Sequence, residues 1–185
     1  MKNTFILTVM MTFLFVGQAM SQGLHIGAKA GVNFANFSGG ELDGFDFTGI
    51  TNFHGGVFLE LATSQRFSIQ PEVIYSSQGA NISDVTSEYQ NRLGYLSVPL
   101  MARIYFVPDR FSLDLGPTFS FLMNEVENPN FSPSNDFDFA LSGGLTGHLS
   151  HNFFLQARYN LGLTDVRPDA NVRNSVIQFS FGIRF

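Results

Sequence analysis

Four histidines are the side chains of this sequence best suited to acid–base or metal chemistry near neutral pH. They are scattered, at His25, His54, His148 and His151, and none stands at a spacing typical of a nucleophile and its base. No HExxH pattern and no glycine-rich phosphate loop occurs, and the absence of cysteine excludes disulfides and thiolate metal sites. We therefore expect no catalytic residue, no cofactor and no metal site.

A second set of reactive side chains consists of charges that stand singly between apolar neighbours. The set comprises Lys29, Glu60, Glu72, Arg103, Asp114, Asp138, Arg158 and Arg184. Four positive and four negative charges cancel, which an enclosed space favours because unpaired buried charge is costly. We expect a structural plug of ion pairs; the alternative is a path for ions or for a substrate.

One ion pair follows from the register of a hairpin. If Phe106 faces Phe111 across the short turn 107–110, Arg103 lies directly opposite Asp114 on the next strand. Opposed unlike charges stabilise a pair of strands. The register therefore predicts that these two side chains meet on one face of the sheet.

The elements that position these charges show a period of two. Apolar and polar residues alternate, typical of strands, whereas no segment after residue 22 has a convincing helical period. Each segment is about as long as the ~9–11 residues that a tilted membrane strand needs. The eight apolar faces span residues 24–34, 53–61, 67–75, 96–106, 111–121, 137–149, 153–161 and 177–185.

The connections between these segments alternate in length. Residues 62–66, 107–110 and 150–152 are short turns, and four longer segments are rich in Asn, Asp, Ser, Gly and Pro. The longer segments are residues 35–52, 78–94, 124–136 and 164–174. Short turns on one side and long loops on the other predict an even-stranded barrel with both termini in the periplasm.

The apolar face of such a barrel can point inward, as in a soluble lipocalin-like barrel, or outward into lipid. The apolar side chains, many of them among 22 phenylalanines, are too bulky for an interior of eight strands. The opposite face carries mainly Gly, Ser, Asn and Gln, which fit a narrow lumen. We therefore predict an all-β fold, an eight-stranded antiparallel up-and-down transmembrane β-barrel.

The N-terminus and the composition agree with export to a membrane. Lys2, an apolar run over residues 5–16 and the small residues Gly17, Ala19 and Ser21 predict a signal peptide over 1–21. Cleavage fits after Ala19 or after Ser21, and residues 22–185 then form one barrel domain. Charged residues make up only 14% of the chain, and a net charge of −5 argues against nucleic acid as a partner.

Several stretches resemble one family. They are IGAKAGVNFANF from Ile26, YLSVPLMARIYF from Tyr95, LDLGPTFSFLM from Leu113, LQARYNLGLTDV from Leu155 and FSFGIRF from Phe179. These stretches are similar to the outer-membrane β-barrel domain family common in Bacteroidota, which includes PorT-like proteins, and to OmpX-like small barrels. The resemblance implies the outer membrane as the location, and Phe181 and Phe185 resemble the signal read by the barrel-assembly machinery. PorT-like members are associated with type IX secretion.

The functional expectation is a non-catalytic integral outer-membrane protein. Its expected partners are the lipid bilayer, the barrel-assembly machinery during folding and an envelope protein bound through loops such as 125–136. Its loops would bind that partner, or the barrel would support the envelope or the secretion machinery. The alternatives are a narrow porin-like channel for ions or small solutes and an enzyme that modifies lipids.

Overall fold

The computed structural model of the chain describes residues 23–38, 46–84, 87–125, 135–165 and 173–185. The expected signal peptide, residues 1–21, and most of loop 125–136 lie outside these ranges. Eight strands are present: β1 (Leu24–Ser38), β2 (Asp46–Ser64), β3 (Phe67–Asp84), β4 (Ser87–Val107), β5 (Phe111–Glu125), β6 (Phe137–His148), β7 (Phe153–Gly162) and β8 (Arg173–Arg184). Nowhere in the described ranges does a helix have the length and hydropathy needed to span a bilayer.

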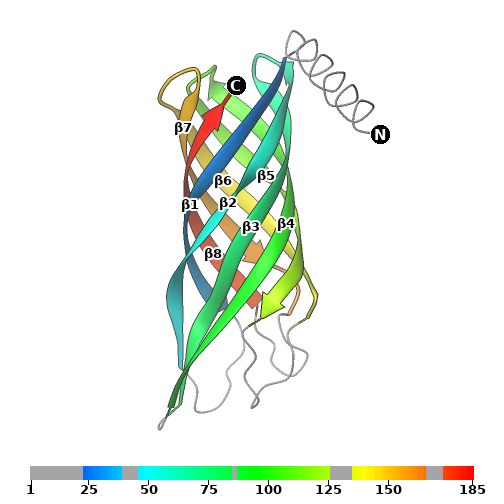
Figure 1. Cartoon of the computed structure of the whole chain (residues 1–185). Helices are drawn as coiled ribbons and strands as arrows, with labels where there is room; N and C mark the ends of the chain where they lie inside the picture. Colours follow the sequence, from blue (N-terminus) through cyan, green and yellow to red (C-terminus); the bar gives the residue numbers. More distant parts are fainter. Residues whose placement is uncertain (1–22, 39–45, 85–86, 126–134, 166–172) are drawn as a thin grey trace, which may run out of the picture.

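The strands close into one barrel, in which each strand is antiparallel to its neighbours (Figure 1). Pairing of β1 with β8, from Gly27 opposite Arg184 to Ser38 opposite Arg173, completes the circle. This arrangement confirms the predicted eight-stranded antiparallel up-and-down barrel. Closure pairs the backbone groups that an open sheet leaves exposed at its edges, which a lipid environment requires.

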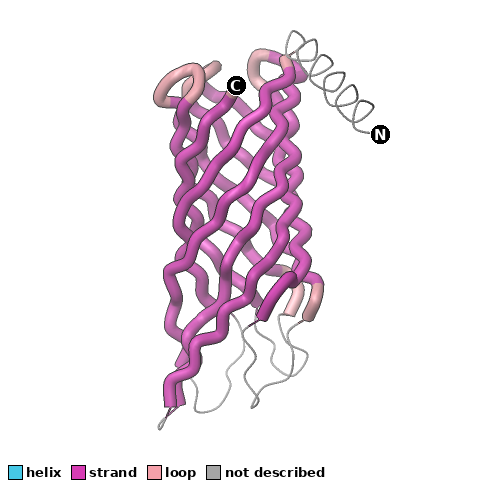
Figure 2. Tube along the Cα trace, in the orientation of Figure 1, coloured by secondary structure: helices cyan, strands magenta, loops and turns pink. Residues whose placement is uncertain are grey.

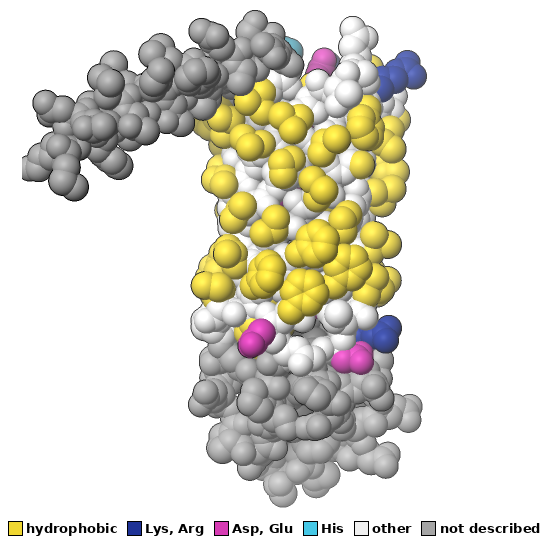
Figure 3. Space-filling view, turned by 90° about the vertical axis from the view of Figure 1, so that its right-hand side faces the viewer, with side chains coloured by type: hydrophobic (Ala, Val, Ile, Leu, Met, Phe, Trp, Pro, Cys, Tyr) yellow, Lys and Arg dark blue, Asp and Glu magenta, His cyan; other side chains and the backbone are white. Residues whose placement is uncertain are grey.

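The two faces of each strand separate apolar from polar residues. In β8, Phe179 and Phe181 are each 51% exposed, whereas Gln178 and Ser180, which alternate with them, are buried. The same alternation recurs in the other strands, so that large apolar side chains cover the outside of the barrel (Figure 3). The prediction that the apolar face points outward is confirmed, and the polar lumen takes the place of a hydrophobic core.

The two ends of the barrel differ (Figure 2). One end, here called the short-turn end, carries the three tight connections together with both ends of the described chain, Gly23 and Phe185. The opposite end, here called the long-loop end, carries the connections between β1 and β2, β3 and β4, β5 and β6, and β7 and β8. The predicted alternation of short and long connections is therefore present.

Two of the predicted loops, 35–52 and 78–94, are shorter in the structure than the sequence predicts. β1 continues to Ser38 and β2 begins at Asp46, while β3 and β4 pair from Gln78 opposite Leu93 out to Asp84 opposite Ser87. Backbone hydrogen bonds hold an antiparallel ladder whatever its side chains are. The strands therefore continue past the point where the apolar alternation, our signal for a strand, ends.

The hairpin of β4 and β5 contains a β-bulge that the sequence did not predict. Val107, not Phe106, lies opposite Phe111, because the register shifts between Tyr105 and Val107. The rings of Phe106 and Phe111 still stack, with centroids 6.1 Å apart. A bulge adds one residue to one strand and so changes the register by one at that point. On the side of the bulge away from the turn, the pairing is the predicted one, with Arg103 opposite Asp114.

Candidate functional site

An ion pair inside the lumen joins β4 and β5. Arg103 Nε donates to Asp114 Oδ1 at 2.7 Å, and its NH2 group donates to Asp114 Oδ2 at 3.1 Å. Both side chains are fully buried, and they lie directly opposite each other across the two strands, as the hairpin register predicts. Two parallel N–H···O bonds fix the geometry of the pair as well as its charge balance.

Glu60 on β2 forms a second centre close to the short-turn end. Arg103 and Arg184 each donate to Glu60 Oε2 at 3.3 Å. The hydroxyls of Tyr105 and Ser68 donate to Glu60 Oε1 at 2.7 and 2.8 Å. A buried carboxylate with four donors has its charge compensated and its lone pairs occupied.

Glu72 on β3 forms a third centre nearer the middle of the barrel. Arg158 holds it with two hydrogen bonds, of 2.9 Å to Oε2 and 2.7 Å to Oε1. Lys29 Nζ lies 2.9 Å from Oε2, and Gln70 donates to Oε1 at 2.7 Å. Two cations, one from β1 and one from β7, therefore share one carboxylate on β3.

Gln156 on β7 connects these centres. Its Oε1 accepts from Lys29 Nζ at 2.8 Å, and its Nε2 donates to Asp114 Oδ2 at 2.7 Å. Seven of the eight charged residues singled out in the sequence therefore form one connected assembly, here called the charge network. It comprises Lys29, Glu60, Glu72, Arg103, Asp114, Arg158 and Arg184, none more than 7% exposed.

Asp138, the eighth predicted member, lies apart from the charge network. It is the second residue of β6 and lies next to the long-loop end. Thr164 donates to its Oδ1 at 2.6 Å and Asn174 donates to its Oδ2 at 2.8 Å. The charge network thus contains four cations and three carboxylates rather than the balanced set that the sequence predicted.

Two inward aromatic rings complete the packing of the lumen near the short-turn end, and the sequence analysis missed both. Phe58 and Phe154 meet edge to face, with centroids 5.6 Å apart. Each ring covers a glycine on the adjacent strand, Gly27 for Phe58 and Gly182 for Phe154. A glycine directly opposite a phenylalanine in the polar register was the signal that could have found them.

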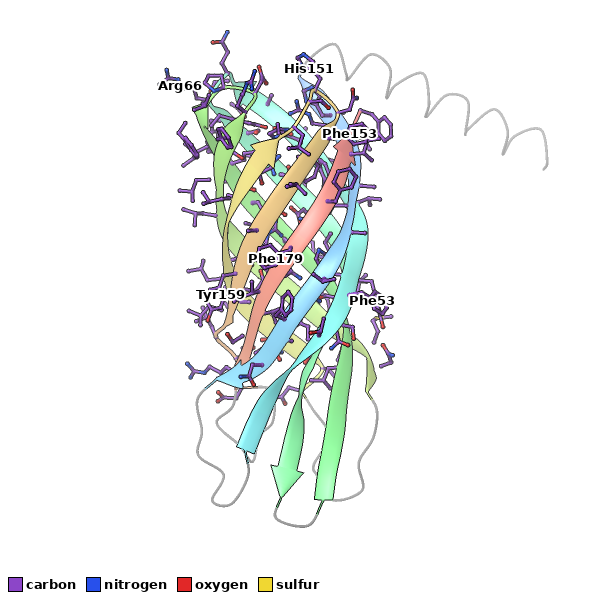
Figure 4. The ribbon with its side chains drawn as sticks, turned by 90° about the vertical axis from the view of Figure 1, so that its left-hand side faces the viewer. Phe53, Arg66, His151, Phe153, Tyr159 and Phe179 are labelled. Atoms are coloured by element: carbon purple, nitrogen blue, oxygen red, sulfur yellow. The ribbon has the colours of Figure 1, made fainter. Side chains whose placement is uncertain are left out.

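The histidines do not converge on a reactive centre. His54 is buried in the lumen, where its Nδ1 donates to Asn33 Oδ1 at 2.6 Å and its Nε2 lies 2.7 Å from Ser180 Oγ. His148 Nε2 lies 3.5 Å from Tyr105 Oη, and His151 stands in a turn at the short-turn end (Figure 4). Within the described ranges, no group of three or more His, Cys, Asp or Glu side chains could hold a metal ion.

The lumen between the charge network and the long-loop end is polar and holds a small space, here called the polar cavity. Its volume is about 20 Å³, room for on the order of one or two water molecules. The lining combines hydroxyl and amide side chains, among them Ser76, Ser97, Thr118, Ser120, Asn160 and Gln178, with the apolar residues Ile74, Pro99, Ala140 and Val176. Arg158 and Asp138 are its charged members.

The outer surface carries aromatic rings towards both ends of the barrel. Phe106 and Phe111 stack near the short-turn end, as do Phe153 and Phe181, with centroids 5.6 Å apart. Near the long-loop end, Phe53 contacts Tyr75 and Phe121 contacts Phe137. Figure 4 shows Phe153 close to one end, and Phe53 and Tyr159 nearer the other. Aromatic rings on both sides of an apolar band are typical of a membrane-spanning barrel.

A closed barrel with an apolar outside and a polar, charged lumen defines the class of integral membrane β-barrels. The chain belongs to the outer membrane protein beta-barrel domain family, whose model matches residues 17–167. This membership locates the protein in the outer membrane. A comparison with curated proteins found no match.

Solved structures with a similar fold are small outer-membrane barrels. OprG from Pseudomonas aeruginosa has a TM-score of 0.57 at 13% identity, with 89% of this chain and 97% of that one covered. Ail, the attachment invasion locus protein of Yersinia pestis, has a TM-score of 0.56 at 15% identity, covering 88% and 99%. Neisserial surface protein A has a TM-score of 0.58 at 14% identity, covering 88% and 97%. At these identities the likeness concerns the fold.

Proposed function

We propose that this protein is a non-catalytic outer-membrane barrel with a sealed lumen, whose loops at the long-loop end bind an envelope partner. The observation that carries the proposal is the charge network. It joins residues of β1, β2, β3, β4, β5, β7 and β8, so it extends across the lumen rather than along one wall. All its members are buried.

The energetics of the charge network favour permanent closure. Moving one partner away would leave a buried charge without compensation, at a cost of ~3–5 kcal/mol. Because each carboxylate holds at least one arginine and further donors, opening a path requires several such losses together. Function is then left to the surfaces outside the membrane, and long barrel loops are common sites of recognition.

The proposal includes the processing and orientation of the chain. Residues 1–21 act as a signal peptide, and residues 22–185 form the mature barrel. The barrel-assembly machinery recognises the end of β8, with Phe181 and Phe185. The short-turn end faces the periplasm and the long-loop end faces outward, the usual arrangement of bacterial barrels. The resemblance of the sequence to PorT-like proteins supports a partner in the envelope or in the secretion machinery.

A narrow channel is the second candidate, favoured by the polar cavity in the outer half of the lumen. Conductance of the purified protein in planar bilayers separates the two candidates. We expect no single-channel steps from the wild-type protein, because the charge network fills the lumen. Reproducible steps from the heat-modifiable, folded species would contradict the sealed barrel and establish the channel.

The same measurement has a positive control in a variant that lacks two ion pairs of the charge network, Arg103 with Asp114 and Arg158 with Glu72. Replacing Glu72, Arg158, Arg103 and Asp114 together by serine removes two positive and two negative charges. Glu60 keeps its ion pair with Arg184, whereas Lys29 loses the carboxylate of Glu72. We expect this variant, where it folds, to conduct. If neither the folded variant nor the wild-type protein conducts, other groups must also seal the lumen.

A further inference from the structure

The polar cavity has an electrostatic asymmetry that the sealed-barrel proposal does not use. Arg158 lines it on the side of the charge network, since β7 runs from the short-turn end past Arg158 to Asn160 and Gly162 in the same lining. Asp138 lies on the side of the long-loop end. The space therefore lies between two walls of opposite charge. The wall on the side of the charge network, with Arg158, is here called the floor, and the wall on the side of the long-loop end, with Asp138, is here called the upper wall.

The floor carries more positive than negative charge. Lys29 and Arg158 share the single carboxylate of Glu72, and the charge network as a whole has one cation more than it has carboxylates. Asp138 does not offset this charge directly, because its two oxygens accept from Thr164 and Asn174 and its described bonds include no cation. A positive charge without a neighbouring anion is costly in a buried site.

The floor also contains a buried hydrogen-bond donor that has no acceptor among the described residues. Arg158 is 3% exposed, and its Nε has no hydrogen-bond partner among the described residues. Its two terminal nitrogens are already engaged by Glu72. Two amides in the lining can also donate, Asn160 through its Nδ2 and Gln178 through the Nε2 hydrogen not given to Asn33, whereas the hydroxyl of Thr118 already donates to Ser142.

We propose that the floor of the polar cavity is a binding site for a monatomic anion such as chloride, held by Arg158 Nε and by amide donors of the lining. The volume of about 20 Å³ has room for on the order of one or two water molecules, a size that matches a monatomic anion better than phosphate. On the upper wall, Asp138 and the free acceptor Asn174 Oδ1 repel an anion and restrict the site to the floor.

Bromide is the probe, because its anomalous scattering distinguishes it from water. Crystals of the full-length mature protein grown in sodium bromide should show an anomalous peak within hydrogen-bonding reach of Arg158 Nε. The melting temperature should be higher in sodium bromide than in sodium gluconate at equal ionic strength, because gluconate does not fit the cavity. A water molecule in place of the peak, with equal melting temperatures in the two salts, would overturn the proposal.

Two variants should shift the apparent bromide affinity in opposite directions. Arg158→Gln removes the donor and a positive charge and should weaken binding about tenfold or more. Asp138→Asn removes the repelling charge and should tighten it, whereas Asp165→Asn, an exposed carboxylate paired with Arg173, should leave it unchanged. If Arg158→Gln does not fold, Asp138→Asn remains decisive, since unchanged or weaker bromide binding in that variant would contradict the assigned site.

Discussion

At the scale of single residues, the lumen is organised by carboxylates that each accept from several donors. Asp114 accepts from Arg103, Thr146 and Gln156, and Ser112 donates to it at 3.2 Å. A shared acceptor of this kind couples side chains from β4, β5, β6 and β7. Loss of one member should therefore affect the others, which a mutational cycle can measure.

Arg103→Met is the sharpest test of this coupling. Arg103 is fully buried and pairs with both Asp114 and Glu60, so its removal leaves two carboxylates with less compensation. We expect the free energy of unfolding to fall by ~3–5 kcal/mol, measured by urea titration in lipid vesicles. Arg66→Met is the control, because Arg66 is exposed in a turn and its removal should change stability by less than ~0.5 kcal/mol.

The double variant Arg103→Met with Asp114→Leu completes the cycle. It removes both charges of the pair and should be less destabilised than the sum of the two single variants, with a coupling of ~1–3 kcal/mol. Strict additivity would show that the two side chains do not stabilise each other.

The sequence could predict which charges enter the lumen but not all of their partners. Alternation assigns Arg103 and Asp114 to the inward face, and the hairpin register brings them opposite each other. The contact of Lys29 with Gln156 spans 127 positions of the chain, so it depends on closure and tilt of the whole barrel. No local pattern contains that information, and this is also why the isolation of Asp138 was not foreseen.

At the scale of the elements, glycines make room for aromatic rings on the adjacent strands inside the lumen. The phenyl ring of Phe58 on β2 covers Gly27 on β1, and the ring of Phe154 on β7 covers Gly182 on β8. The alternation rule missed this because it classified inward positions as small and polar. The rule counts residue types along one strand, whereas the packing depends on which residue stands opposite on the next.

Gly27→Ala tests this packing. A Cβ at position 27 would lie 2.2 Å from Phe58 Cζ and 2.4 Å from the backbone oxygen of Ile183, too close for the strands to keep their positions. We expect a loss of ~1–3 kcal/mol in the free energy of unfolding, the usual cost of overpacking.

Gly55→Ala is the matched control on the neighbouring strand. A Cβ at that position would meet its nearest atoms at 3.7 Å, an ordinary contact. The control should therefore be nearly neutral in the same urea titration. Equal losses in the two variants would mean that the cost comes from the flexibility of glycine rather than from the ring of Phe58.

At the scale of the whole molecule, an apolar band faces lipid and a lumen of buried polar side chains takes the place of a hydrophobic core. The band lies between the two ends of the barrel, and the exposed charged side chains lie beyond it at either end (Figure 3). Composition and alternation predicted this inside-out arrangement, because eight strands cannot enclose so many large apolar side chains. They could not predict how far β2, β3 and β4 extend at the long-loop end, since the apolar signal ends before the backbone pairing does.

The proposed orientation of the barrel in the membrane rests on the difference between its two ends, and the chain is suited to testing it because it contains no cysteine. A single cysteine introduced as Asp136→Cys lies at the long-loop end, and Arg66→Cys lies in a turn at the short-turn end. Both native side chains are exposed, so a membrane-impermeant maleimide should reach either thiol wherever the solvent contains it.

In intact cells we expect labelling of Asp136→Cys alone, because in the proposed orientation the long-loop end faces outward and the short turns face the periplasm. Permeabilised cells should label both variants equally, which controls for reactivity. Labelling of Arg66→Cys alone in intact cells would show that the barrel has the opposite orientation. It would then contradict the proposal that the long-loop end binds the partner.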